Sequence, residues 1–227
     1  MSYAIKECFH TLQGEGAQAG RAAVFLRFAG CNLWSGREET RDAAETVCRF
    51  CDTDFVGTDG QGGGTFRTAE ALADHVEQVW SVDEEADGRR YVVCTGGEPL
   101  LQLDQAALDA LHDRGFAVAV ETNGTIGPTS SPAIKLDPAD LDWICVSPKA
   151  DARLHLTSGD ELKLVHGQLL APPERFVDLD FDHLLLQPMD VGDAAANAER
   201  TKQAVDYCMR HPRWRLSLQT HKVLDIP

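Results

Sequence analysis

The feature that most constrains this fold is a set of short apolar segments, most of which lack polar alternation. They are Ala22–Phe28, Tyr91–Cys94, Ala117–Val120, Trp143–Val146, Leu184–Leu186 and Leu216–Leu218. Runs this short that stay apolar are typical of strands buried on both faces, as in a parallel sheet. The segments therefore predict a mainly parallel sheet.

Helical patterns lie between these segments. Thr68–Trp80 carries apolar residues at helical spacing behind a capping threonine, and Asp104–Arg114 is followed by Gly115 as a predicted C-cap. Ala194–Arg210 is a third helical segment. Alternating strands and helices predict an α/β fold with right-handed crossovers.

Two stretches do not fit this alternation. Residues 32–47 are polar and charged and suggest a short inserted helix, whereas residues 125–140 are rich in proline and serine and predict a loop. Neither resembles a linker between domains. We therefore expect the 227 residues to form a single domain.

The charge balance excludes several classes of protein. The chain has 21 Lys and Arg against 36 Asp and Glu, a net charge of −15. A protein this acidic lacks the clustered positive charge that non-specific nucleic-acid binding requires. It has no apolar run of about 20 residues to cross a membrane, and its first residues contain no apolar core of a secretory signal. We expect a cytoplasmic protein that binds neither nucleic acid nor membrane.

The cysteines suggest a metal or redox site. Three of the seven, Cys31, Cys48 and Cys51, lie in one polar stretch, with sixteen residues between the first two and two between the last two. Three thiolates without an obvious fourth could hold an iron–sulfur cluster with one open iron. The alternatives are a zinc site completed by a histidine such as His10, or a redox Cys-x-x-Cys pair. Ordinary packing accounts for the rest, which are Cys8, Cys94, Cys145 and Cys208.

A glycine pair favours the cluster among these alternatives. Thr95–Pro99 reads TGGEP and directly follows the predicted strand Tyr91–Cys94. Paired glycines let the polar head of a ligand approach the backbone, and the carboxylate of Glu98 suits an ammonium group. In α/β folds, ligands bind at the carboxyl ends of the strands. We expect a ligand with an amino group to bind here.

These two motifs resemble the radical S-adenosylmethionine superfamily. The expanded cysteine loop, together with further short blocks along nearly the whole chain, resembles its 7-carboxy-7-deazaguanine synthase family. Those blocks are TLQGEG (residues 11–16), RFAGCNLW (27–34), CDTDF (51–55), CTGGEP (94–99), ETNG (121–124), SPKA (147–150), QPMD (187–190) and QTHK (219–222). The loop is slightly longer than in the family, and the extra residues fall within the charged insert.

The resemblance implies a fold and a reaction. The fold would be a partial TIM-type barrel of about six parallel strands, with a reduced helix set and a cluster-loop insert at about residues 32–47. One electron from a flavodoxin or ferredoxin would reach a 4Fe–4S cluster, which would cleave S-adenosylmethionine to methionine and a 5′-deoxyadenosyl radical. That radical would start the conversion of 6-carboxy-5,6,7,8-tetrahydropterin to 7-carboxy-7-deazaguanine with loss of ammonia. The resemblance also implies bound Mg²⁺ and a homodimer.

The resemblance further implies roles for individual residues. Cys31, Cys48 and Cys51 would hold the cluster, and Thr53 would bind Mg²⁺, with Asp52 and Asp54 adding negative charge beside it. The predicted substrate contacts are Leu12, Gln13, Gly14, Glu15, Arg27, Thr95, His221 and Pro227. The predicted contacts with S-adenosylmethionine are Phe50, Asp52, Gly96, Gly97, Glu98, Asn123, Ser147, Pro148, Lys149, Gln187, Pro188, Met189 and Asp190.

Arg27 also carries a signal of its own, because its charge interrupts an apolar strand and its guanidinium suits a substrate carboxylate. Three other hypotheses remain open. They are another radical S-adenosylmethionine enzyme such as a glycyl-radical activase, a zinc-binding interaction module, and an inactive chain on the same scaffold.

Overall fold

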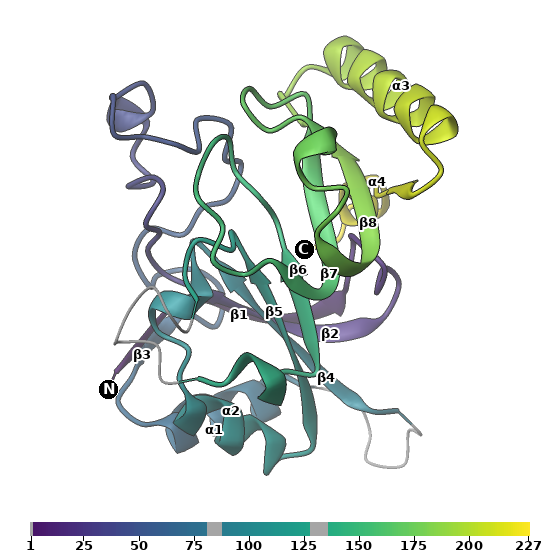
Figure 1. Ribbon diagram of the computed structural model, residues 1–227. Helices are drawn as coiled ribbons and strands as arrows, with labels where there is room; N and C mark the ends of the chain where they lie inside the picture. The colour runs from purple at the N-terminus through teal and green to yellow at the C-terminus, as the bar shows by residue number, and fades with distance from the viewer. Residues whose placement is uncertain (1, 81–87, 128–135) are drawn as a thin grey trace.

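One nine-stranded sheet organises the molecule, in the order β3-β1-β2-β4-β5-β6-β7-β8-β9 (Figure 1). The computed structural model describes residues 2–80, 88–127 and 136–227. The strands are β1 (Tyr3–Leu12), β2 (Ala22–Phe28), β3 (Gly64–Phe66), β4 (Arg90–Gly96), β5 (Phe116–Thr122), β6 (Trp143–Val146), β7 (Ser158–His166), β8 (Asp180–Pro188) and β9 (Trp214–Leu216).

The sheet is mostly parallel. β2 and the six strands β4 to β9 all pair in parallel, while β1 pairs antiparallel with both β2 and β3. The parallel part therefore has one strand more than the predicted six. The α/β prediction is confirmed, because short apolar runs do form the buried parallel strands.

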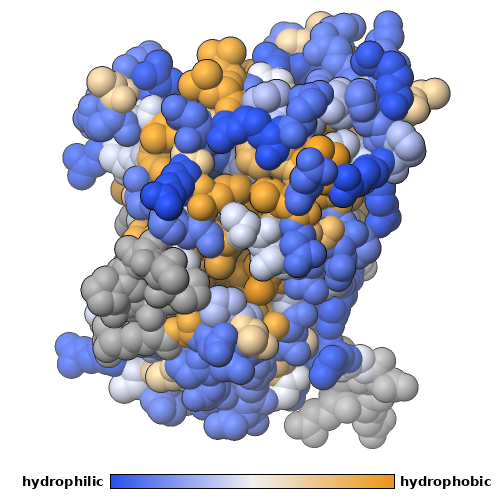
Figure 2. All heavy atoms as spheres, in the orientation of Figure 1, coloured by the Kyte–Doolittle hydropathy of each residue, from blue (hydrophilic) through white to orange (hydrophobic). Residues whose placement is uncertain are grey.

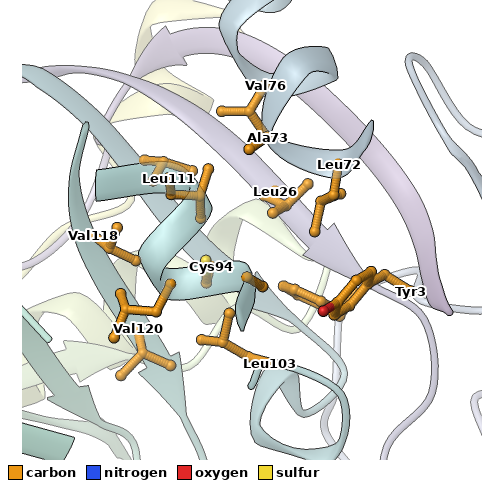
Figure 3. Close-up of a cluster of buried hydrophobic side chains, with 14 of the residues drawn as sticks. Tyr3, Leu26, Leu72, Ala73, Val76, Cys94, Leu103, Leu111, Val118 and Val120 are labelled. Carbon is orange, nitrogen blue, oxygen red and sulfur yellow. The ribbon is translucent and has the colours of Figure 1, made fainter. Parts of the chain in front are cut away.

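Two helices cover one face of the sheet. α1 (Ala69–Val79) and α2 (Gln105–His112) lie side by side in the lower part of Figure 1. Leu72 and Val76 of α1 and Leu111 of α2 pack onto Leu26 and Val118 of the strands (Figure 3). This core fixes the sheet from outside and leaves its opposite face for a ligand.

A second cluster supports the other end of the sheet. α3 (Ala194–Arg210) lies beside β8 in Figure 1 and contributes Ala204, which packs with Leu162 and Leu164 of β7. Since side chains alternate across a strand, Glu161 and Lys163 must point to the opposite face. Glu161 and Lys163 thus lie on the side away from this core.

On the face opposite α1 and α2, the residues are apolar up to the middle of the strands and polar toward their carboxyl ends. Ala23, Tyr91, Val93, Ala117 and Ala119 form a small apolar cluster there. Further along the same face of each strand the residues are polar: Arg27 on β2, Thr95 on β4 and Glu121 on β5. The polar ends of neighbouring parallel strands therefore meet at one edge of the sheet.

The helix predictions are confirmed with small shifts. Thr68 caps α1 by accepting a hydrogen bond from the Ala71 backbone N–H at 3.1 Å. Asp104 caps α2 in the same way. The C-cap of α2 is Asp113, and the predicted Gly115 follows two residues later with a φ of +76°.

Three strands of the structure, β1, β3 and β7, were not among the strands predicted from apolar segments. β1 and β7 contain charged residues that interrupt their apolar pattern, and β3 is only three residues long. The predicted strand Leu216–Leu218 is displaced, because β9 ends where that segment begins. Paired charges inside β1 and β7 explain why an apolar criterion missed them.

The remaining elements are short. They are η1 (Glu38–Thr40), η2 (Pro99–Leu101), η3 (Pro138–Asp140), η4 (Pro173–Arg175) and α4 (Thr220–Leu224). The helix predicted within residues 32–47 is the single 3₁₀ turn η1. The loop predicted over 125–140 contains η3, and its residues 128–135 lie outside the described part.

The surface is largely hydrophilic. Figure 2 shows hydrophilic residues over most of the face turned to the viewer, with hydrophobic ones gathered in a central band. Among the described helices, none has both the length and the hydropathy needed to cross a bilayer.

Candidate active site

A cavity of about 360 Å³ lies at the carboxyl ends of the parallel strands. All eight predicted substrate contacts line it, as do the three cysteines and Thr53. So do the predicted S-adenosylmethionine contacts except Glu98 and Pro148. Segments spread from residue 7 to residue 227 therefore share one cavity.

The cysteine loop and the glycine pair meet at one end of this cavity. The Glu98 backbone N–H donates to the Gly30 carbonyl at 2.9 Å, and the Gly30 N–H donates to the Phe55 carbonyl at 3.1 Å. A Cβ added to Gly97 would lie 2.0 Å from the Gly30 oxygen and 3.0 Å from the Cys31 Cβ. The backbone at Gly97 thus needs glycine because it lies directly against the first cysteine.

The thiols themselves suit a cluster better than a single metal ion. Among the described residues, no group of three Cys, His, Asp or Glu side chains converges on one ion position. A closed zinc site requires such convergence, whereas the cysteines of a cubane bind different irons and stand further apart. The hydrogen bond between Cys48 and Cys51 lowers the pKa of Cys51 and raises that of Cys48, and burial raises the pKa of Cys31. Three cysteines that line one cavity fit an iron–sulfur cluster with an open iron.

The histidine proposed to complete a zinc site lies elsewhere. His10 belongs to β1, does not line the cavity, and its ring packs on Trp80 with centroids 4.9 Å apart. Burial lowers its pKa. The zinc alternative with His10 as fourth ligand is wrong.

Trp34 is a cavity residue that the sequence analysis assigned no role. Its indole N–H is buried and has no acceptor among the described residues. The Arg41 guanidinium lies 4.1 Å from the centre of its ring, and Phe55 meets it edge-on. The Trp34 indole N–H is therefore a buried donor, fixed at the cavity wall, to which a bound ligand could supply the missing acceptor.

Glu98 was predicted to contact the ligand, but its side chain does not line the cavity. It is fully buried, and its carboxylate accepts hydrogen bonds from Thr122 Oγ1 at 2.8 Å, the Asn123 N–H at 2.8 Å and the Leu100 N–H at 3.0 Å. Burial raises the pKa of this carboxyl group. In this structure the side chain fixes the end of β5 beside the glycine pair, and the backbone of that pair faces the cavity.

Pro148 is the other predicted contact away from the wall. It is buried, and its carbonyl accepts a hydrogen bond from Gln168 Nε2 at 3.0 Å. Its neighbours Ser147 and Lys149 do line the cavity, and Lys149 Nζ donates to the Ser147 carbonyl at 3.0 Å. The proline anchors a turn that presents the residues on either side.

The opposite end of the cavity is lined by charged and amide side chains. Arg27 Nε donates to Glu7 Oε2 at 2.9 Å, across the antiparallel pair β1 and β2. Among the described residues, nothing accepts a hydrogen bond from the terminal nitrogens of Arg27. The pair with Glu7 therefore orients the guanidinium and leaves its outer edge for a substrate group.

A buried lysine lies next to these residues. Lys163 Nζ is 2.7 Å from Glu15 Oε2 and 3.1 Å from Glu121 Oε1. Glu121 also accepts hydrogen bonds from Gln13 Nε2 at 3.1 Å and Thr95 Oγ1 at 3.2 Å. Three of the predicted substrate contacts thus belong to one network centred on Glu121 and Lys163.

The C-terminal segment closes another side of the cavity. The Thr220 N–H donates to the Gly14 carbonyl at 2.8 Å, and the Pro227 carbonyl accepts from Thr11 Oγ1 at 2.9 Å. His221 lies so close to Gly14 that a Cβ there would be 2.2 Å from its Nδ1. His221 and Pro227 therefore lie beside the first predicted substrate loop.

The carboxylates beside Thr53 are paired with lysines. Lys222 Nζ contacts Asp52 Oδ2 at 3.0 Å and Asp190 Oδ2 at 2.6 Å, and Lys6 Nζ contacts Asp54 Oδ2 at 2.9 Å. The predicted negative charge around Thr53 is reduced and not removed, because two carboxylates share each lysine: Asp52 and Asp190 share Lys222, and Asp54 and Asp59 share Lys6.

Sequence reasoning missed four cavity residues that make important contacts. They are Trp34, Glu121, Lys163 and Lys222. A charge inside an otherwise buried strand was the available signal for Glu121 and Lys163, as it was for Arg27. Trp34 and Lys222 lie in quoted blocks but gave no signal separate from their neighbours.

Known proteins resemble the chain over its full length. No protein-family model matches it. The 7-carboxy-7-deazaguanine synthase of Caulobacter vibrioides is 61% identical over 227 residues, covering 100% of both chains. That of Bordetella pertussis is 60% identical with the same coverage.

A solved structure agrees with the sequence relatives. The crystal structure of QueE from Escherichia coli superposes with a TM-score of 0.63 at 25% identity, covering 96% of this chain and 94% of that one. High identity over whole chains, with one cavity joining the cysteine loop to the polar strand ends, leads to one conclusion. The chain belongs to the 7-carboxy-7-deazaguanine synthase family.

Proposed function

We propose that the chain converts 6-carboxy-5,6,7,8-tetrahydropterin to 7-carboxy-7-deazaguanine with release of ammonia. The observation that carries the proposal is the single cavity in which the cysteine loop and glycine pair face a network of charged and amide side chains. Family membership supports the same reaction.

The cysteine end would hold the cofactors. Cys31, Cys48 and Cys51 would bind a 4Fe–4S cluster, and the backbone at Gly96 and Gly97 would receive the amino group of S-adenosylmethionine. When bound, these cofactors supply the radical that removes a hydrogen atom from the substrate. The protein residues position the reactants and exclude water.

The remaining S-adenosylmethionine contacts would come from the ends of other strands. Ser147 and Lys149 follow β6, Gln187 and Pro188 are the last residues of β8, and Met189 and Asp190 follow it. Their position on the cavity wall supports this assignment. Glu98 and Pro148 would contribute indirectly, by fixing the loops that carry the contacts.

The polar end would bind the pterin. The Arg27 guanidinium suits the substrate carboxylate, because a planar fork binds a carboxylate through two parallel hydrogen bonds. Glu15 and Gln13 offer acceptors and donors for the ring nitrogens and carbonyl. His221 and Pro227 lie against the same loop and would complete the pocket.

Mg²⁺ would bind at Thr53. A threonine hydroxyl on the cavity wall supports this assignment, since Mg²⁺ prefers oxygen ligands and keeps several waters. Substrate oxygens would supply further ligands.

We also propose a homodimer that receives electrons from a flavodoxin or ferredoxin. The chain would form a single domain with its cluster-loop insert at about residues 32–47, and its sheet would represent a partial barrel. The continuous sheet from β1 to β9 supports one domain.

An anaerobic assay tests the proposal. We would reconstitute the protein with iron and sulfide, reduce it, add S-adenosylmethionine and 6-carboxytetrahydropterin, and analyse products by mass spectrometry. Appearance of 7-carboxy-7-deazaguanine is expected. Formation of 5′-deoxyadenosine without that product would contradict the substrate, and a protein that retains zinc and forms neither would contradict the cluster.

Cysteine variants test the ligand set in the same preparation. Cys48→Ala should lose most of its iron, because one iron of the cluster would have no thiolate. Cys208→Ala is the matched control, since Cys208 lies in α3, packs against the core beneath that helix and does not line the cavity. Full iron content in Cys48→Ala would overturn the assignment.

A further inference from the structure

Lys163 is the charged group most deeply enclosed in the substrate end of the cavity. It lies at the centre of β7, and only 5% of its surface is exposed. Leu162 and Leu164 on either side point into the core beneath α3, so the lysine side chain points inward. A buried ammonium costs free energy unless it is paired and hydrogen-bonded.

The lysine joins segments that are distant in sequence. Its ammonium contacts Glu15, from the loop after β1, and Glu121, from the end of β5. Both carboxylates have further partners, because Glu15 Oε1 accepts from Gln219 Nε2 at 2.9 Å and Glu121 Oε2 accepts from Thr95 Oγ1 at 3.2 Å. One cation therefore fixes groups from β5, β4, the first loop and the C-terminal segment.

We infer that Lys163 is a positioning residue for the pterin end of the site. It acts through Glu15 and Glu121, which it holds in place on the cavity wall. Through Glu121 it also orients Gln13, whose Nε2 donates to the same carboxylate oxygen. The inference deepens the proposed function and rests on it.

Electrostatics explains why this site needs a cation. Burial alone would raise the pKa of Glu15, yet the neighbouring Lys163 brings it down to about 2. Without the lysine, two buried carboxylates would share one pocket and repel each other. The loop that carries Gln13 and Glu15 would then move away from Glu121.

The other charges around the lysine do not replace it. Glu161, two residues earlier on β7, accepts a hydrogen bond from the Ala17 N–H at 2.8 Å and another from Cys145 Sγ at 3.3 Å. It adds a third carboxylate to the region and therefore increases the need for a cation. Arg27 is engaged by Glu7 and belongs to a different pair.

Binding measurements on Lys163→Met test the inference, because methionine has a similar length and no charge. The dissociation constants for 6-carboxytetrahydropterin and S-adenosylmethionine would be measured by anaerobic calorimetry on the reconstituted protein. Pterin binding should weaken by at least about tenfold. S-adenosylmethionine binding should stay within about twofold, because Lys163 contacts Glu15 and Glu121, whereas the predicted cofactor contacts Asp52 and Asp190 join this network indirectly, through Lys222 and Gln219. Equal loss of both, or no loss of pterin binding, would overturn the inference.

A double-mutant cycle separates positioning from an independent contact. If Lys163 acts through Glu121, Lys163→Met should weaken pterin binding less in a Glu121→Gln background than in the native one. Additive effects would contradict the inference. The double variant also removes one charge of each sign, so it serves if the single variant fails to fold.

Arg114→Met is the control for general destabilisation. Arg114 joins α2 to Asp74 of α1, on the face of the sheet away from the cavity. It should leave pterin binding unchanged. If the native protein itself does not bind the pterin, the proposed function fails; if it binds and Lys163→Met binds equally well, only the role of Lys163 fails.

Discussion

Single atoms decide whether the cysteine end of the cavity can form. The backbone at Gly97 lies against Gly30 and Cys31, where any side chain would collide with a carbonyl oxygen. The site therefore depends on the absence of a side chain as much as on the three thiols. At the polar end, orientation instead depends on pairs of opposite charges such as Arg27 with Glu7.

Gly97→Ala should lose its cluster. Its Cβ would lie 2.0 Å from the Gly30 oxygen, so the loop that carries Cys31 must move. Iron and sulfide per chain after anaerobic reconstitution measure the effect. Gly88→Ala is the matched control, because a Cβ there meets no atom of a described residue within 4 Å. Equal iron in both variants would show that the loop tolerates the shift.

Arg27→Gln should weaken pterin binding about 10- to 100-fold, the range for losing hydrogen bonds between charged groups. S-adenosylmethionine binding should not change. Arg21→Gln is the control, since the Arg21 guanidinium lies 3.7 Å from the centre of the Tyr91 ring and does not line the cavity. Calorimetric titration of both ligands decides between a substrate contact and a structural role, which would weaken both.

The elements of the fold differ in how far the sequence could predict them. Apolar segments such as Trp143–Val146 became strands with the predicted bounds, because burial on both faces leaves an unambiguous pattern. β7 was not predicted, because Glu161 and Lys163 interrupt the apolar pattern. Those charges are stable in a strand only because they pair with residues from other parts of the chain. The direction of the Glu98 side chain was equally unpredictable, since it depends on donors from β5.

The family resemblance supplied most of the predicted site residues, and the topology of the sheet explains why they share one cavity. They follow parallel strands, and the carboxyl ends of parallel strands meet at one edge. The contacts of α4 could not be foreseen, because a five-residue helix has little pattern of its own. Its place is fixed by Lys222, which contacts Asp52 in the cysteine loop and Asp190 after β8.

Lys222→Met should release α4 from both neighbouring segments. Amide hydrogen exchange in residues 219–226 is expected to accelerate, because the contacts to Asp52 and Asp190 would be lost while those of Thr220 to Gly14 remain. Lys202→Met is the control, since Lys202 is an exposed residue of α3. Unchanged exchange in α4 would mean that its other contacts hold it alone.

The molecule as a whole combines a strongly acidic composition with buried carboxylates. Its net charge of −15 at pH 7 destabilises the compact state through repulsion, which weakens as the pH falls toward the isoelectric point near 4.8. Glu98 and Glu161 act in the same direction. Burial raises the pKa of each, so folding favours their protonated forms and gains stability as the pH falls.

Glu15 acts in the opposite direction. Its folded pKa of about 2 lies below the ordinary value of 4.5, so its contribution is complete above about pH 4.5 and is lost as the pH falls toward 2. The pKa of Asp190 is also depressed, by its hydrogen bond to Lys222.

We therefore expect the stability of the metal-free protein to rise from pH 8 to a maximum between about 5 and 6, and to fall below about 4.5. Urea unfolding across this range measures it. At pH 8, added salt should stabilise the protein by screening surface repulsion, whereas near pH 5 it should have little effect. Stability that falls steadily from pH 8 downward, with no response to salt, would mean that surface repulsion is not a significant term in this fold.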